Sequence, residues 1–180
     1  MASRSKTKKE KNEEIKIEFK YVLLTFVAAL MGYIADFFRF PNSWTFALTL
    51  GFLILLIVNF NKRNGISILI YFMIWNALVL PLFIFSMKVA LVSQILFLVI
   101  NLVAYYLIIS GLRRLKKWGF YLTIIVFALS LVNIIFALIS SQTTFVFNLP
   151  NMLVLAKNII LLVFLITSVA YVIKSKKSFH

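Results

Sequence analysis

Titratable side chains, which carry most catalysis and metal binding, are scarce in this chain of 180 residues. It has five carboxylates, one histidine and no cysteine. Four of the carboxylates, Glu10, Glu13, Glu14 and Glu18, precede the first long apolar run, and the histidine is His180. Acid–base pairs, nucleophile–histidine pairs and metal sites each require several such groups close together. The sequence therefore predicts a protein that is not an enzyme and binds no metal or other cofactor.

Asp36 is the one remaining carboxylate, near the end of the first apolar run. Arg39 follows one turn later, and Lys157 lies about one turn into the last apolar run from the same side. Ala28, Gly32 and Asp36 share a helix face, and small residues let a neighbouring helix approach closely, so we expect this face to point inward. Two interpretations stay open: Asp36 pairs with Arg39 or Lys157 and holds helices together, or the bases here attract an anion.

Amide side chains form the second group of candidate site residues. Asn76, Asn101 and Asn133 each lie near the middle of an apolar run, and Gln94 shares a helix face with Asn101. An amide in hydrocarbon seeks a hydrogen-bond partner, so we expect these groups to face one another inside a bundle. They either join helices, at about 0.6–2 kcal/mol per bond, or line a polar path or small-ligand pocket. Their spacing does not separate the two alternatives.

The elements that must position these groups are long apolar runs. The chain is 63% apolar and 13% charged, against about 45–50% and about 25% in soluble domains. Residues 66–111 carry one charge, Lys88. A single helix over this stretch would be about 70 Å long, more than twice the thickness of a bilayer core of about 30 Å. This stretch must fold back, and Pro81 with residues 86–88 supplies the place. The sequence predicts an all-α polytopic integral membrane protein, a bundle of six transmembrane helices at about 19–38, 44–60, 66–86, 89–111, 118–139 and 152–173.

The two ends of the chain differ from this transmembrane domain, which we place at 15–173. Residues 1–14 are rich in lysine, glutamate and serine and are expected to be a disordered cytoplasmic leader. Apolar and charged residues alternate over 15–21, a pattern typical of a strand. Because an apolar run follows, we expect a helix that enters the membrane instead. Residues 174–180 form a basic cytoplasmic tail.

The distribution of positive charge predicts the orientation. With six spans, sixteen of the nineteen lysines and arginines fall on one side, and Arg39, Lys88 and Lys157 fall on the other. Cytoplasmic loops carry such an excess of bases, so we expect a cell-membrane protein with both termini cytoplasmic (N-in/C-in). The bases lie in short clusters between apolar runs, which favours anionic lipid headgroups as partners and argues against nucleic acid.

These observations favour one function and leave an alternative. The scarcity of titratable groups and the ample apolar and aromatic surface favour an accessory, scaffold or interaction subunit of a membrane assembly. Its partner would be another membrane protein or a second copy of this chain. The alternative is a small transporter or channel for an anion or an apolar solute, which would use the region of Asp36, Arg39 and Lys157 and the buried amides.

Overall fold

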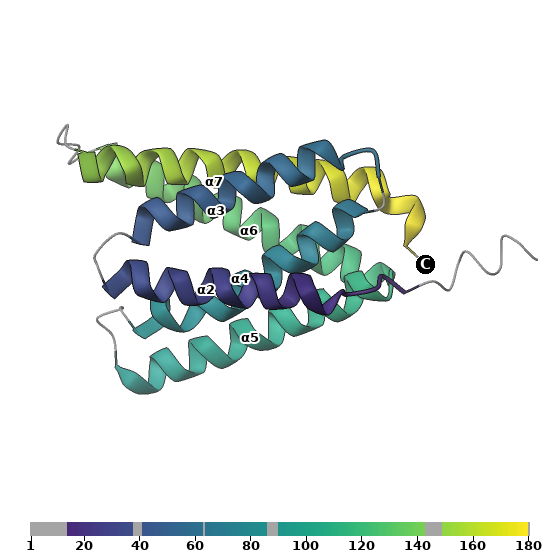
Figure 1. Cartoon of the computed structure of the whole chain (residues 1–180), viewed down its shortest axis with the longest axis horizontal. Helices are drawn as coiled ribbons and strands as arrows, with labels where there is room; N and C mark the ends of the chain where they lie inside the picture. Colours follow the sequence, from purple (N-terminus) through teal and green to yellow (C-terminus); the bar gives the residue numbers. More distant parts are fainter. Residues whose placement is uncertain (1–13, 38–40, 63, 86–89, 143–148, 180) are drawn as a thin grey trace, which may run out of the picture.

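The structure, a computed structural model, describes residues 14–37, 41–62, 64–85, 90–142 and 149–179. These residues form an elongated bundle of α-helices that run side by side (Figure 1). The elements in chain order are α2 (Phe19–Phe37), α3 (Pro41–Val58), α4 (Asn64–Phe85), α5 (Leu91–Arg113), α6 (Lys117–Gln142), α7 (Leu149–Lys174) and the 3₁₀ helix η1 (Ser175–Ser178).

Each apolar run of the sequence forms one of these helices, and the all-helical fold is confirmed. Helix bounds differ from the expected ones by up to three residues, and two of the three largest differences lie where proline occurs. α3 begins at Pro41 rather than at Trp44, because proline lacks an amide hydrogen and suits the first position of a helix. α7 likewise begins at Leu149, one residue before Pro150. Pro81 lies inside α4, which continues to Phe85 before the chain turns back.

Four of the helices are long and apolar enough to cross a membrane. The segments concerned are Asn64–Pro81, Leu91–Arg113, Lys117–Phe136 and Met152–Ser178. Two shorter apolar segments, Phe19–Ala35 and Trp44–Val58, lie in α2 and α3. By length and composition, these four helices suit a helical membrane protein.

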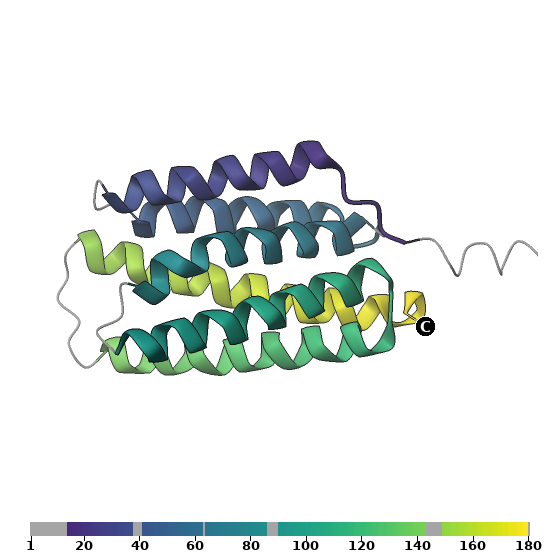
Figure 2. The same cartoon turned by 90° about the horizontal axis from the view of Figure 1, so that it is seen from below.

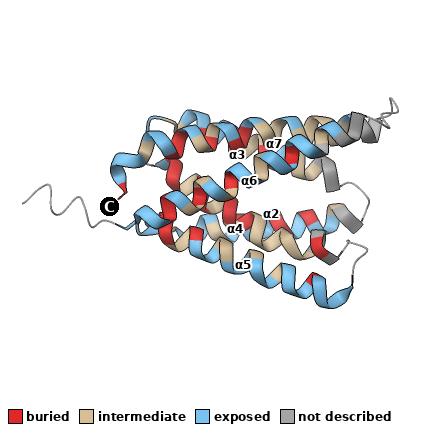
Figure 3. Ribbon diagram, turned by 180° about the vertical axis from the view of Figure 1, so that it is seen from behind, coloured by how far each residue is buried: buried red, intermediate tan, exposed pale blue. Residues whose placement is uncertain are grey.

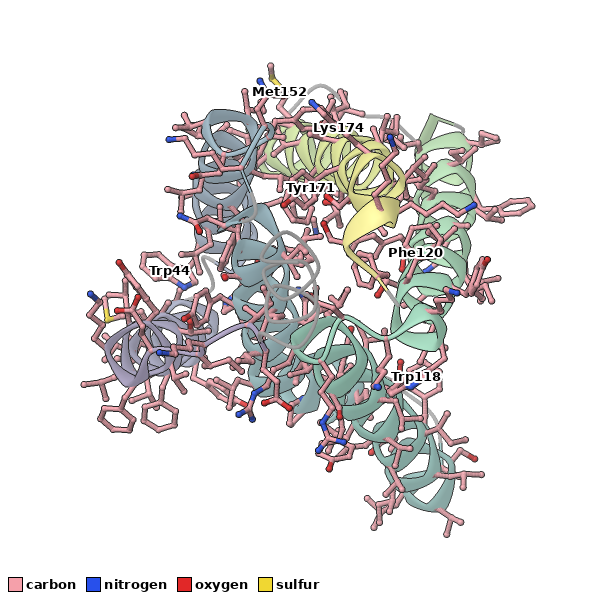
Figure 4. All side chains as sticks on the ribbon, turned by 90° about the vertical axis from the view of Figure 1, so that its right-hand side faces the viewer. Trp44, Trp118, Phe120, Met152, Tyr171 and Lys174 are labelled. Atoms are coloured by element: carbon pink, nitrogen blue, oxygen red, sulfur yellow. The ribbon has the colours of Figure 1, made fainter. Side chains whose placement is uncertain are left out.

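The helices form a closed circuit in which each contacts the next. The order is α2, α3, α7, α6, α5 and α4, and α4 returns to contact α2. α4 also contacts α3 and α7, which places it nearer the middle than the others. Figures 2 and 4, from the side and from one end, show this arrangement. The most extensive contact joins α3 and α7, which run parallel although they are far apart in the sequence.

Buried side chains are not evenly spread along the described part of the bundle. They are concentrated toward the end where residues 14–18 and 175–179 lie, whereas exposed residues follow the outer side of α5 (Figure 3). The largest fully buried side chains include Leu56 of α3, Ile66, Leu69, Ile70 and Met73 of α4, Ile108 and Leu112 of α5, Phe127 of α6, and Phe164, Tyr171 and Val172 of α7. This end is therefore the most closely packed part of the described structure.

Residues 15–18 do not form the helix that we expected from the sequence. They are extended, and α2 begins at Phe19. The backbone N–H of Ile15 donates to the carbonyl oxygen of Arg113 at 2.8 Å, and the Ile15 side chain is buried. The prediction is wrong here because this segment satisfies its backbone by pairing with a distant turn rather than with its own neighbours.

Candidate functional site

Four segments of the chain gather at one end of the bundle, which we call the basic end. They are residues 14–18, 59–62, 114–116 and 175–179 (Figure 1). Ten described lysines and arginines lie in or beside these segments: Lys16, Lys20, Lys62, Arg113, Arg114, Lys116, Lys117, Lys174, Lys176 and Lys177. The described carboxylates of this end are Glu14 and Glu18. Positive charge therefore predominates here.

The turn between α5 and α6 is a compact helix stop. The N–H of Lys116 donates to the carbonyl of Gly111 at 3.0 Å, and that of Leu115 donates to Leu112 at 3.2 Å. This is the Schellman pattern, whose left-handed position glycine usually occupies. Here it is Leu115, with φ of 52°. Its side chain is 2% exposed, and this apolar burial offsets the cost of the backbone conformation.

Two glycines on either side of this turn let α5 and α6 touch through their backbones. A Cβ added to Gly111 would lie 2.5 Å from the Cα of Gly119 and 2.9 Å from the Trp118 ring. A Cβ added to Gly119 would overlap the backbone of Gly111. Because no side chain separates the helices, the turn and the two helix ends behave as one rigid unit.

The N-terminal segment is tied to this unit by charge as well as by its backbone. Oε2 of Glu14 lies 3.3 Å from Nη2 of Arg113, and Oε1 lies 3.8 Å from Nε of Arg114. Further along, the N–H of Glu18 donates to the Tyr71 hydroxyl of α4 at 3.0 Å. The segment thus spans from the α5–α6 turn to α4 before α2 begins.

The end of α7 is held against the α3–α4 connection. The Tyr171 hydroxyl donates to the carbonyl of Lys62 at 2.7 Å. Lys174 donates to the Asn61 side-chain oxygen and lies 4.9 Å from the centre of the Phe60 ring. Tyr171 and Lys174 are labelled in Figure 4, which looks onto this end.

The C-terminal residues fold back onto α6 instead of extending away. After η1, the Phe179 side chain is 6% exposed, and its ring centre lies 5.4 Å from that of Phe120. Phe120 is the fourth residue of α6. The predicted basic tail is therefore, over 175–179, an ordered part of the basic end.

The ion-pair cluster expected from the sequence lies mostly outside the described residues. Arg39 falls in an undescribed segment, and the side chain of Asp36, near the end of α2, is also not described. Lys157 is half-buried on α7 and has an interaction partner. The small-residue face is confirmed for its first two members: Trp44 of α3 packs on Gly32, and its indole N–H donates to the Ala28 carbonyl at 2.9 Å.

The amide side chains do not bind one another as expected. Asn76 donates to the carbonyl of Phe72 and Asn101 to that of Phe97, both at 2.8 Å and both within their own helices. Asn133 is exposed on α6. Within the described chain, no hydrogen bond joins any two of these asparagines. Gln94 is buried and has an interaction partner.

Hydroxyl side chains within the helices show the same local pattern. Six of them donate to the carbonyl four residues earlier, at 2.7–2.9 Å, a common arrangement for serine and threonine in apolar helices. The residues are Thr25, Thr49, Thr123, Ser130, Thr167 and Ser168. Trp75 is buried against Phe52 and Phe72, and its indole N–H has no hydrogen-bond partner among the described residues.

Sequence reasoning did not single out the residues that organise the basic end. Two of only five glycines, Gly111 and Gly119, flank one basic loop, which was a usable signal. Phe179, an aromatic residue within a lysine-rich tail, was another. Nothing in the spacing pointed to the pairing of Glu14 with Arg113, because it depends on contacts between distant segments.

The fold and this end together define a class: an all-helical protein with four helices long and apolar enough to span a membrane. Comparison with protein-family models, with curated proteins and with solved structures finds no match to this chain. In the described residues no three histidine, cysteine, aspartate or glutamate side chains come together as metal ligands would.

Proposed function

We propose that all six helices cross the cell membrane and that the basic end faces the cytoplasm. α2 and α3, with 19 and 18 residues, are about 27–29 Å long, close to a bilayer core of about 30 Å. Large apolar side chains on α2 and α3, such as Leu24, Ile57 and Val58, are more than half exposed. The gathering of bases at one end supports the orientation through the positive-inside rule.

Cysteine labelling tests this topology directly, because the chain has no cysteine of its own. Single cysteines replace Lys116 or Ser178 at the basic end, Ala90, which is exposed before α5, and Ser43 in the first turn of α3. In intact cells, a membrane-impermeant maleimide is expected to label Ser43→Cys and Ala90→Cys, and to reach the other two only after permeabilisation. Labelling of Lys116→Cys from outside contradicts the orientation, and protection of Ser43→Cys in cells where Ala90→Cys is labelled contradicts the crossing of α2 and α3.

Within the membrane, we propose that the chain is a non-enzymatic accessory or scaffold subunit. The observation that carries this proposal is the contrast between its interior and its surface. Asn76, Asn101, Thr123 and Ser168 donate to carbonyls of their own helices, so these polar groups are not available to act on a solute. By contrast, α5 buries only Gln94, Ile108, Gly111 and Leu112 among its described residues. Its uncovered apolar side is available to another membrane protein.

Bulky substitutions on uncovered faces test the scaffold proposal. Val99 and Val103 are exposed on α5, and Leu129 is exposed on α6. Tryptophan at such positions adds volume on the outer side of the bundle, because each of these side chains is more than half exposed. We expect the chain to co-purify in mild detergent with a membrane protein or a second copy. The double variant Val99→Trp with Val103→Trp is expected to reduce the amount of co-purified partner more than Leu129→Trp does.

The alternative, a small transporter or channel, is favoured by the half-buried Lys157 and the buried Gln94 within apolar helices. Reconstitution in vesicles distinguishes the two functions. Flux of an anion or apolar solute that falls with Lys157→Gln or Asn101→Leu, in a folded protein recovered without a partner, contradicts the scaffold proposal. A partner that co-purifies equally with every tryptophan variant contradicts the assignment of the α5 side as its docking surface.

A further inference from the structure

We propose that Lys116, Lys117, Lys176 and Lys177 form a surface that binds the headgroup of an anionic phospholipid. We call these four residues the lysine surface. The inference rests on the proposed topology and deepens it, since it names one side of the basic end and one class of ligand. It differs from a general attraction to the membrane because it depends on how the tail is folded.

A contact between two aromatic residues brings the lysine pairs together. The Phe179 ring packs on Phe120 with ring centres 5.4 Å apart. The Phe179 N–H donates to the carbonyl of Lys176, and the Phe120 N–H donates to that of Lys116, both at 3.2 Å. Each aromatic residue is thus hydrogen-bonded to the backbone of one lysine pair. The contact therefore holds η1 beside the start of α6, a position visible in Figure 4.

The lysine surface differs in charge balance from the part of the basic end around Glu14 and Glu18. Arg113 and Arg114 are paired with Glu14, and Nζ of Lys20 lies 2.7 Å from Glu18. The two described carboxylates of this end are therefore engaged by bases outside the lysine surface. All four members of the lysine surface are exposed, and no described carboxylate forms an ion pair with them. Their charge is available to an anion.

The neighbouring part of α6 indicates a lipid rather than a free anion. An uncovered apolar stripe runs down the helix from the lysine surface: Trp118, Tyr121, Ile125, Leu129, Val132 and Phe136. Spacings of three and four residues place these side chains on one helix face. Tryptophan prefers the membrane interface, so Trp118 marks the headgroup level. A phospholipid satisfies both features, with its phosphate at the lysines and an acyl chain along the stripe.

Native mass spectrometry of the purified full chain tests this assignment. The protein, in a neutral detergent, is titrated with phosphatidylglycerol or with phosphatidylcholine of the same acyl chains, and retained lipid is counted. We expect selective retention of phosphatidylglycerol. Lys176→Gln with Lys177→Gln is expected to weaken it by about 30-fold, roughly fivefold per lysine. Phe179→Ala, which keeps every base, is expected to weaken it by about fivefold, because the tail is no longer held in place.

Two controls make the result specific. Lys16→Gln with Lys20→Gln removes the same charge from the N-terminal segment and the start of α2, outside the lysine surface, and is expected to change retention less than twofold. Glycerol phosphate, the headgroup anion without acyl chains, is expected to compete poorly. Equal losses in the two double variants, an unaffected Phe179→Ala protein, or full competition by glycerol phosphate each overturn the proposal.

The cysteine substitution at Ser178 separates this inference from the proposed topology. If Ser178→Cys is labelled from outside the cell, the proposed orientation fails. If it is protected but the lysine variants retain phosphatidylglycerol as the unaltered chain does, the orientation stands and the lysine surface fails.

Discussion

Replacing Gly111 with alanine is expected to lower the free energy of unfolding by about 3 kcal/mol, at the upper end of the range for overpacking. The new methyl group would lie 2.5 Å from the Cα of Gly119. Backbone cannot rotate away as a side chain can, so α5 and α6 must separate. That movement also disturbs the turn that holds Leu115 and the carbonyl that accepts the N–H of Ile15.

Reversible unfolding in mixed micelles measures this effect, and Gly51→Ala is the matched control. A Cβ at Gly51 meets nothing within 4 Å, so alanine there is expected to be neutral or to stabilise α3 by up to about 1 kcal/mol. Gly119→Ala is expected to resemble Gly111→Ala, since it enters the same contact from the other helix. Equal stability of Gly111→Ala and Gly51→Ala would contradict the backbone contact.

Gly65→Ala, at the start of α4, is expected to lower the free energy of unfolding by about 2–3 kcal/mol. An added Cβ would overlap the Tyr171 ring. The ring cannot move without loss, because it is buried and its hydroxyl donates to the Lys62 carbonyl at 2.7 Å. Equilibrium unfolding of the purified variant gives the loss.

A double-mutant comparison identifies the cause of that loss. In a Tyr171→Phe background the ring remains, so Gly65→Ala is expected to stay costly. In a Tyr171→Ala background the ring is absent, and the additional cost of Gly65→Ala is expected to fall below about 0.5 kcal/mol. An equal cost in both backgrounds would show that Tyr171 is not the obstacle.

The helices could be predicted from the sequence because four of the six apolar runs end at a proline, a glycine or a group of bases, and the other two end at short polar stretches. Their neighbours could not, since a helix that is apolar all round shows no preferred face. Ala28 and Gly32 were the exception, because small residues indicate where a neighbouring helix can approach closely. Trp44 of α3 packs at this place on α2. Nothing in the sequence of either helix indicated that α3 would pack against α7.

The polar side chains show a second limit of sequence reasoning. We expected Asn76 and Asn101 to seek partners on other helices, yet both donate to the carbonyl four residues earlier. That carbonyl is always within reach in a helix, so an amide in an apolar span is not evidence of a neighbouring polar group. The extended form of 15–18 was missed for the opposite reason, since Ile15 pairs with a residue far along the chain.

The parallel contact of α3 with α7 has a consequence for how the protein is made. A ribosome delivers α3 second and α7 last among the described helices, so α3 must wait through most of synthesis before its principal neighbour exists. During that interval Thr49 and Leu56, fully covered in the finished bundle, lack that neighbour. The circuit of helices can close only after α7 has been translated, so the synthesis of α7, rather than of any earlier helix, is the step that lets the described bundle reach its native shape.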